Sequence, residues 1–276
     1  MKKTLRILCF GDLVGDPGKA MFDKWSSYLK DKHEADTIIV NGENMSKNGR
    51  GIHPNDVEFL RERNVSAITS GNHVWAHKKI GQCLQDEDSI LLRPANYPSS
   101  CPGRGYRIFT IEGIAVAVVS LQGRVFMRED LDCPFKTIDS LLMFLKYRTK
   151  IILIDFHAEA SSEKKMLGLH LDGQVSCVYG THTHVQTGDE RILPGGTGYI
   201  TDIGCAGANN SAIGMTKESV MFRFLTQMPS TFKVEKNGEM AMNLLLVEID
   251  VETGKTRHIE RIEVIDPEIS KTFEEE

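Results

Sequence analysis

Polar clusters placed directly after short apolar runs constrain this chain more than any other feature of its sequence. Apolar runs of about four to eight residues, rich in β-branched side chains, are typical of buried strands. In layered α/β folds, binding sites are built at the carboxyl ends of such strands. The sequence therefore predicts a site assembled from the ends of several strands. The clusters are Gly11-Asp12, Gly42-Glu43-Asn44, Gly71-Asn72-His73, residues 155–159 and residues 180–184.

Strand and helix patterns alternate through the first half of the chain, which favours parallel β-α-β units. The last part of the chain is mostly strand-like. We expect an α/β fold with two sheets in a single domain spanning residues 1–276. Strands are expected over 5–10, 37–40, 66–69, 114–120, 151–154, 175–179, 199–201 and 242–251. Helices are expected over 18–30, 54–63, 136–147 and 217–224, with a further capped helix start at Ser161.

Length and composition indicate a globular protein that can bury a sizeable core. The chain has 276 residues, of which 41% are hydrophobic and 26% charged, and its formal net charge is -5. This charge supplies no basic field to recruit long nucleic acids or an anionic membrane, so we expect neither as a partner. A small anionic substrate would need local neutralisation, which bound metal ions supply.

Cysteine usage and the N-terminal run both favour the cytoplasm. The 6 cysteines form no C-x-x-C pair, and several lie in apolar runs, so we interpret them as buried, reduced thiols. The apolar run before Gly11 is interrupted by Arg6 and is too short for a signal peptide. No stretch approaches the roughly 20 apolar residues of a membrane span.

Two histidines in the last cluster give the sharpest chemical signal. His182 and His184 are two positions apart, so they share one face if strand geometry continues. Each imidazole could then bind one of two adjacent ions, and the alternative is a pair of polar histidines at a loop start. His157 is either a further ligand or a hydrogen-bonded structural residue. Glu159 either orients an imidazole or is a surface carboxylate.

Carboxylates follow the first and second apolar runs. Asp12 is a candidate metal ligand or a turn residue that caps the next helix, a capping role that Asp16 fits better. Glu43 can bridge two cations with one oxygen to each, which would help hold them roughly 3.5–4 Å apart. Asn44 is a neutral oxygen ligand, a hydrogen-bond partner of a phosphate or a turn residue.

The third cluster combines a carboxamide with an imidazole. Asn72 is a candidate oxygen ligand, and His73 could donate a proton to a leaving oxygen. The alternative for His73 is a solvent-facing loop residue. Together the clusters offer enough nitrogen and oxygen ligands for two metal ions, so metal-assisted hydrolysis of a phosphate ester is the leading hypothesis.

At these positions the chain resembles the calcineurin-like metallophosphoesterase superfamily and, more closely, its YmdB-like bacterial branch. Val14 stands where the wider superfamily has the histidine of Asp-x-His. Glu43 replaces the usual bridging aspartate, and Val74 replaces an acid after Gly-Asn-His. These departures agree with the branch, so no metal preference is carried over from the wider superfamily. The matching segments are 11–15, 41–44, 71–73, 93–96, 155–160, 180–187 and 199–204.

The resemblance implies a four-layer α/β/β/α metallophosphoesterase sandwich with a dinuclear site at one edge. A metal-bridging hydroxide would attack phosphorus in line, and His73 would protonate the departing oxygen. The branch implies phosphodiesterase activity on 2',3'-cyclic nucleotides with two metal ions per chain, Fe being expected and Mn, Zn or Ni the alternatives. The ligands implied for one ion are Asp12, Glu43, Asn44 and His184, and those for the other are Glu43, Asn72, His157 and His182.

Other functions stay open. The same site could serve a phosphomonoesterase or a nuclease, and the fold could serve a non-catalytic regulatory or scaffold protein. The presence of every implied ligand together with His73 favours the enzyme. The expected partner is a small phosphodiester, either a cyclic nucleotide or a short RNA end, and the branch resemblance allows a homo-oligomer.

Overall fold

A seven-stranded sheet, sheet A, forms one half of the computed structural model, which describes residues 2–269. The ends of the expected 1–276 domain, residue 1 and residues 270–276, lie outside this range. The strands of sheet A are β1 (Thr4–Phe10), β2 (Asp12–Leu13), β3 (Thr37–Asn41), β4 (Ala67–Thr69), β11 (Cys205–Ala208), β12 (Met240–Asp250) and β13 (Thr256–Asp266). Their order is β2-β11-β12-β1-β3-β4, with β13 paired to β12. Strands β1, β3 and β4 run parallel.

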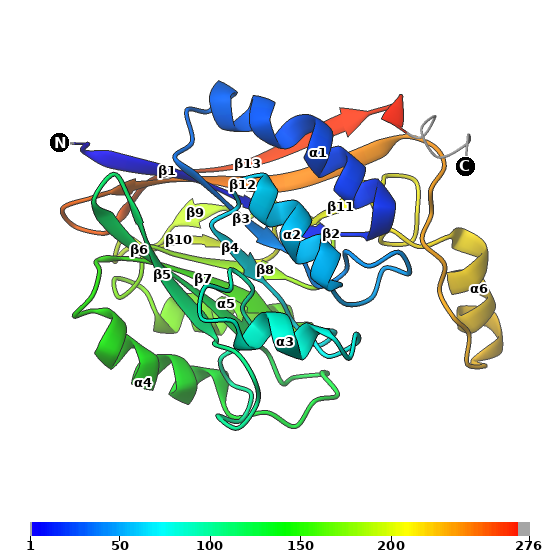
Figure 1. Ribbon diagram of the computed structural model, residues 1–276, viewed down its shortest axis with the longest axis horizontal. Coiled ribbons are helices and arrows are strands. Elements are labelled where there is room, and N and C mark those ends of the chain that lie inside the picture. Colours follow the sequence, from blue (N-terminus) through cyan, green and yellow to red (C-terminus); the bar gives the residue numbers. More distant parts are fainter. Residues whose placement is uncertain (1, 270–276) are drawn as a thin grey trace.

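A six-stranded sheet, sheet B, forms the other half (Figure 1). Its strands are β5 (Tyr106–Ile111), β6 (Ile114–Gln122), β7 (Ile151–His157), β8 (Cys177–Thr181), β9 (Arg191–Ile192) and β10 (Gly198–Ile200). Their order is β5-β6-β7-β8-β10-β9, and the four inner strands are parallel. The parallel strands of each sheet therefore present their carboxyl ends at a common edge.

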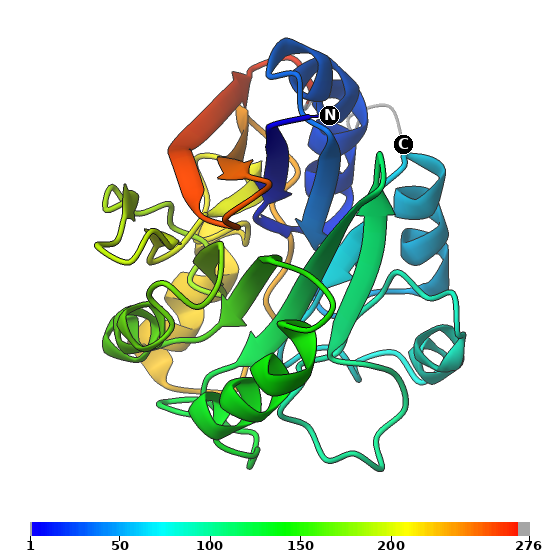
Figure 2. The ribbon, with the colours of Figure 1, turned by 90° about the vertical axis from the view of Figure 1, so that its left-hand side faces the viewer.

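Helices cover the two outer faces, and the sheets lie between them (Figure 2). Helices α1 (Gly15–Lys32), α2 (Pro54–Glu62) and α3 (Ile80–Gln85) pack on sheet A. Helices α4 (Pro134–Leu145) and α5 (Ser161–His170) pack on sheet B, and α6 (Lys217–Thr226) stands at one side of the molecule (Figure 1). Within residues 2–269, no helix combines the length and apolar character needed to cross a lipid bilayer.

Three apolar cores separate four layers, which confirms the expected α/β/β/α sandwich. One core joins sheet A to its helices, one joins the two sheets, and one joins sheet B to its helices. Strand β1 shows the cause, because successive side chains of a strand point to opposite faces. Leu8 and Phe10 contribute to the helix-facing core, whereas Ile7 and Cys9 contribute to the core between the sheets. A strand that is buried on both faces must be apolar throughout.

The expected strands and helices are present, but two expected helix caps are wrong. Helix α1 begins at Gly15 with Val14 as its N-cap residue, so Asp16 lies inside the first turn and forms an ion pair with Lys19. Helix α5 begins at Ser161, but its N-cap residue is Ala160 and no side chain caps it. In both cases the residue before the helix has the extended backbone that an N-cap position requires, without the usual hydrogen-bonding side chain.

The elements missed by sequence reasoning are short or lie at sheet edges. Strand β5 ends sheet B, and every residue along it is at least partly exposed. Strand β13 lies off the main strand order of sheet A, where it pairs with β12, and it carries charged side chains on its exposed face. Edge strands often carry such charges, and these dilute the apolar pattern that marks a buried strand.

Candidate metal centre

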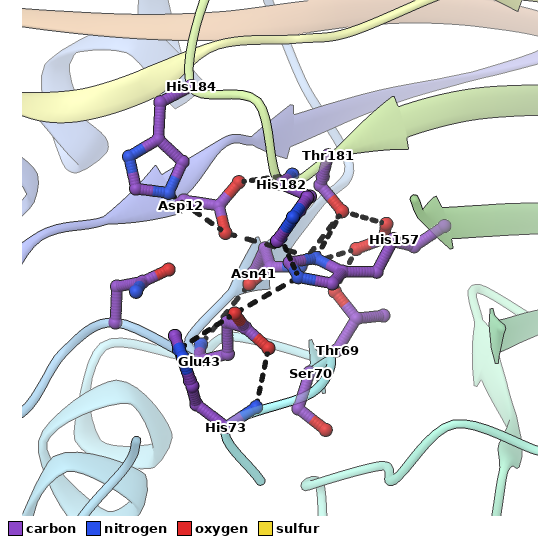
Figure 3. Close-up of polar contacts among 12 residues, drawn as sticks. Asp12, Asn41, Glu43, Thr69, Ser70, His73, His157, Thr181, His182 and His184 are labelled. Atoms are coloured by element: carbon purple, nitrogen blue, oxygen red, sulfur yellow. Dashed lines mark hydrogen bonds and ion pairs between the residues drawn. The ribbon is translucent and has the colours of Figure 1, made fainter. Parts of the chain in front are cut away.

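The candidate site lies where strands of both sheets end at one edge of the sandwich (Figure 3). Asp12 opens β2, and Glu43 lies two residues past the end of β3. His157 is the last residue of β7, not a residue beyond it, and stands in register with Thr181 at the end of β8. His182 follows directly, and its backbone N–H donates to Oδ2 of Asp12 over 3.1 Å, although the two are 170 residues apart.

Three predicted ligands converge on a ring nitrogen of a fourth, His157. Nε2 of His157 lies 3.0 Å from Oε1 of Glu43, 3.0 Å from Nδ1 of His182 and 3.1 Å from Oδ1 of Asn72. Glu43, His157 and His182 each offer a ligand atom within 4.8 Å of the others. We call Glu43, Asn72, His157 and His182 the His157 group. The side chains of His157 and Glu43 are buried, so their contacts form in a dry environment.

A buried hydrogen-bond network beneath this group sets the tautomer of His157. The Thr181 hydroxyl donates to Oδ1 of Asp155 over 2.7 Å, and Thr69 and Asn41 donate to Oδ2. Because a hydroxyl has one proton, Thr181 must accept from Nδ1 of His157, 2.9 Å away. When His157 is neutral, as a metal ligand must be, its Nε2 lone pair is therefore directed at the group. Burial raises the pKa of Asp155 to about 6, so its carboxylate is ionised at neutral pH.

The pKa values of the two histidines in the group are shifted in opposite directions. Burial alone would lower the pKa of His157, but the Glu43 carboxylate outweighs burial and the pKa is raised. Burial would likewise raise the pKa of Glu43, but contact with His157 holds it well below its usual value. Burial and the neighbouring His157 together lower the pKa of His182 to about 3. His182 therefore stays neutral at physiological pH and keeps a lone pair for a cation.

The remaining predicted ligands, Asp12, Asn44 and His184, lie beside this group and are called the Asp12 group. Nε2 of His184 lies 3.7 Å from Oδ1 of Asp12, and Nδ1 of His184 donates to the backbone oxygen of Ile213 over 3.0 Å. Nδ2 of Asn44 donates to the oxygen of Gly49. Burial raises the pKa of Asp12, whereas in His184 burial is outweighed by Asp12 and the pKa is raised to about 10.

Two buried oxygens of the Asp12 group have no hydrogen-bond partner among the described residues. They are Oδ1 of Asp12 and Oδ1 of Asn44. An unsatisfied buried acceptor costs about 1–3 kcal/mol, so such atoms are uncommon in folded proteins. Coordination of a cation would satisfy an oxygen of this kind. Carboxylate, carboxamide and imidazole donors together suit Fe, Mn, Zn or Ni, so the residues present fit a metal centre.

His73 lies at the rim of the site. Its backbone N–H donates to Oε2 of Glu43 over 3.2 Å. Its Nδ1 lies 3.2 Å from Oε1 of Glu43 without the alignment of a hydrogen bond. The His73 side chain is 24% exposed, so it can meet both the buried carboxylate and a bound molecule.

Sequence reasoning missed part of the supporting network. Asp155 is fully buried and ties β7 to β3, β4 and β8, and its only signal is a carboxylate inside an otherwise apolar run. Glu159 is expected either to orient an imidazole or to be a surface carboxylate, and it does both. Its Oε2 lies 3.1 Å from Nε2 of His182, while its side chain is half exposed, so it holds the ring from the solvent side.

The four-layer sandwich and the cluster of candidate nitrogen and oxygen ligands at its strand ends define a protein of the metallophosphoesterase class. A family model described as YmdB-like protein matches residues 8–262. The chain therefore belongs to the YmdB-like protein family. It is 43% identical over 262 residues to the 2',3'-cyclic-nucleotide 2'-phosphodiesterase of Bacillus subtilis (strain 168), a match that covers 95% of this chain and 98% of the relative.

Solved structures show the same fold. A novel phosphatase from Mycoplasma pneumoniae superposes with a TM-score of 0.89 at 33% identity, covering 97% of this chain and 95% of that one. A hypothetical protein from Thermus thermophilus superposes with a TM-score of 0.87 at 35% identity, covering 95% of this chain and 100% of that one. Both comparisons extend over nearly the whole length of the sandwich.

Proposed function

We propose that this protein is a dinuclear metal-dependent phosphodiesterase that hydrolyses 2',3'-cyclic nucleotides. The observation that carries the proposal is the convergence of Glu43 and His182 on Nε2 of His157, beside the unpartnered oxygens of Asp12 and Asn44. The name of the Bacillus subtilis relative supports the substrate class.

Each ion would have its own ligands, and one carboxylate would serve both. The Asp12 group with Glu43 would hold one ion, and the His157 group would hold the other. Two bound metal ions supply a water-derived nucleophile at neutral pH and neutralise charge on the phosphoryl oxygens. Glu43 fits the bridging role because it is buried and contacts His157 with one carboxylate oxygen while the other accepts from His73.

His73 is proposed as the proton donor to the leaving oxygen. Cleavage of a 2',3'-cyclic phosphate expels a ribose alkoxide, which is a poor leaving group unless it is protonated. An imidazole at the rim of the site can reach such an oxygen, and the Glu43 carboxylate beside it can hold the ring in place. His73 would therefore act on the departing oxygen as its bond to phosphorus breaks.

The proposal extends to the metal, the cellular location, the substrate and the oligomeric state. We propose Fe as the bound metal, with Mn, Zn and Ni as alternatives, and a cytoplasmic location, since all six cysteines are free. The proposed partner is a cyclic nucleotide or a short RNA end, because a net charge of -5 disfavours long nucleic acids. A homo-oligomer is also proposed, and light scattering would test it.

Elemental analysis of protein prepared without chelator, run beside hydrolysis of a 2',3'-cyclic nucleotide, tests the proposal. We expect about two metal ions per chain and turnover of the cyclic nucleotide. A His157→Gln variant should lose metal and activity, whereas a matched His258→Gln variant should keep both. His258 is an exposed histidine on β13 that contacts Glu260. Absence of metal and of turnover, even after reconstitution with Fe or Mn, would favour a scaffold role instead.

A phosphomonoesterase or nuclease on the same site is the second candidate. It is favoured by the solved phosphatase with the same fold. The discriminating measurement compares a nucleoside monophosphate, a single-stranded RNA and a 2',3'-cyclic nucleotide at equal concentration. Preference for either of the first two substrates would replace the cyclic nucleotide in the proposal while leaving the metal site in place.

A further inference from the structure

A buried ion pair lies beside the proposed metal site but contributes no ligand to it. Nζ of Lys164, in the first turn of α5, donates to Oδ2 of Asp202 over 2.7 Å. Asp202 lies just past β10. The side chains of Lys164 and Asp202 are only 2% and 0% exposed. Charges buried to this extent are expensive to desolvate, so an ion pair in this position needs a structural or functional reason.

The Asp202 carboxylate forms hydrogen bonds with the residue that lies between His182 and His184. Its Oδ2 accepts from the backbone N–H of Thr183 over 3.2 Å and from the Thr183 hydroxyl over 2.7 Å. Nζ of Lys164 also donates to that hydroxyl over 3.3 Å. Thr183 is the single residue between His182 and His184, so the ion pair fixes the point from which both imidazoles project.

This turn has a backbone that needs support. His182 has φ 93° and His184 has φ 61°, so both lie in the left-handed region that a β-carbon disfavours. Such conformations persist when the surrounding structure holds them, and they concentrate at functional sites. The hydrogen bonds from Thr183 to Asp202 supply that support.

The same carboxylate also reaches the segment that carries Asp12. Its Oδ1 accepts from the backbone N–H of Gly204 over 2.8 Å, and the oxygen of Gly204 accepts from the N–H of Asp12 over 3.2 Å. Asp12 in turn accepts from the N–H of His182. Asp202 therefore closes a ring of backbone contacts that joins both histidines to Asp12.

The chain leaves room for Lys164 to reach this position. A β-carbon at Gly180 would lie 2.8 Å from Cδ of Lys164 and 1.8 Å from the backbone oxygen of Thr201. Only glycine at this position lets the lysine stem pass and lets β8 approach the segment after β10. The path of the buried lysine is thus built into the strand that leads to the histidines.

We propose that Lys164 and Asp202 form a positioning clamp that sets the geometry of His182, His184 and Asp12 and thereby the metal affinity of the site. This inference rests on the proposed function, because those three residues are proposed ligands. Lys164 neutralises Asp202, and the carboxylate is then free to organise Thr183 and Gly204 without leaving a buried charge unpaired. Partners of this kind typically change metal affinity about 10–100-fold when they are removed.

The test is Mn²⁺ titration of metal-free full-length protein by calorimetry, with the variants Asp202→Asn and Lys164→Met/Asp202→Asn. The double variant removes both charges, so it leaves no unpaired buried ion and should keep its fold. We expect Mn²⁺ affinity to fall about 10–100-fold in both variants. Histidine side-chain NMR signals of the metal-free protein should also shift, which a role in stability alone would not produce.

Lys24→Met is the matched control. It removes a lysine of α1 that pairs with Asp266 at the end of β13, and neither residue belongs to the proposed site. Its Mn²⁺ affinity should equal that of the wild type. A double variant that is folded and binds Mn²⁺ as tightly as the wild type would overturn the clamp alone. A wild-type protein that binds neither Mn²⁺ nor Fe²⁺ would overturn both the clamp and the proposed metal site.

Discussion

The two groups of proposed ligands lie side by side but are organised differently. In the His157 group, ligand atoms of Glu43, Asn72 and His182 lie 3.0–3.1 Å from one ring nitrogen. In the Asp12 group, the corresponding contact between Asp12 and His184 is 3.7 Å, and two buried oxygens have no hydrogen-bond partner among the described residues. The first group is thus held together by close contacts among its own side chains, whereas the second has fewer such contacts and two acceptors without a hydrogen bond.

This difference indicates how a bound cation would act in the His157 group and in the Asp12 group. In the His157 group it would replace contacts that exist, and the group has Asp155 and Thr181 beneath it to keep its ring orientation. In the Asp12 group it would supply contacts that are missing. We therefore expect changes in the two groups to have different consequences, and Glu43, which belongs to both proposed sites, to matter most.

The largest effect is expected for Glu43→Gln. The change removes the negative charge that both proposed sites share while nearly keeping the shape of the side chain. If several kcal/mol of transition-state stabilisation depend on the two ions, turnover should fall about 10⁴-fold or more. Metal content and hydrolysis of a 2',3'-cyclic nucleotide measure the effect. Glu58→Gln, a change at an exposed glutamate of α2, should leave both unchanged.

A smaller loss is expected for His73→Ala. If His73 donates a proton to the leaving oxygen, removing it should slow turnover of a cyclic nucleotide about 10²–10⁴-fold while metal content stays near two. A p-nitrophenyl phosphodiester should be affected much less, because its leaving group departs without protonation. Equal losses on both substrates would argue against the acid role, and loss of metal would place His73 among the ligands.

The comparison between the two groups is sharpened by Asp12→Asn. The substitution keeps the size of the side chain but removes its charge, which weakens the Asp12 group and leaves the His157 group intact. Metal content should fall from about two to about one, and the affinity of the lost ion should drop at least about 10–100-fold. Elemental analysis after dialysis measures the change, and loss of both ions would show that the groups do not act separately.

The smallest effect is expected from crowding the His157 group through Gly71→Ala. A β-carbon at Gly71 would lie 2.0 Å from Cδ2 of His157 and 2.3 Å from Oε2 of Glu43, so both side chains must shift. The free energy of unfolding should fall by about 1–3 kcal/mol, as for other overpacked sites. The control, Gly81→Ala in α3, meets only Pro102 at 3.9 Å and should raise stability by about 0.4–1 kcal/mol.

Much of the fold, and the grouping of several candidate ligands, could be predicted because the apolar runs that precede them are local signals. Strands such as β7 are buried on both faces, so their residues are apolar throughout most of their length and stand out in the sequence. The polar residue that follows such a run must lie near the sheet edge. This is why Glu43, His157 and His182 could be proposed from the sequence and are brought together in the structure.

What could not be predicted depends on contacts between distant segments. Asp155 and Asp202 are carboxylates whose partners come from other strands or from α5, so nothing near them in sequence indicates their roles. The same holds for β13, which becomes a strand by pairing along β12 and not through an apolar pattern of its own. Such contacts depend on how distant segments pack together, and the residues next to each position in the sequence do not indicate this packing.

The position of β12 has a consequence for the order of events during synthesis. This strand, residues Met240–Asp250, pairs with β1, β11 and β13 in sheet A. While the ribosome has released only the earlier part of the chain, β1 lacks its antiparallel neighbour, although every proposed ligand has already been made. Because contacts between distant segments form late, the site should become complete only after β12 has been translated. Metal capture would then act as the final step of maturation.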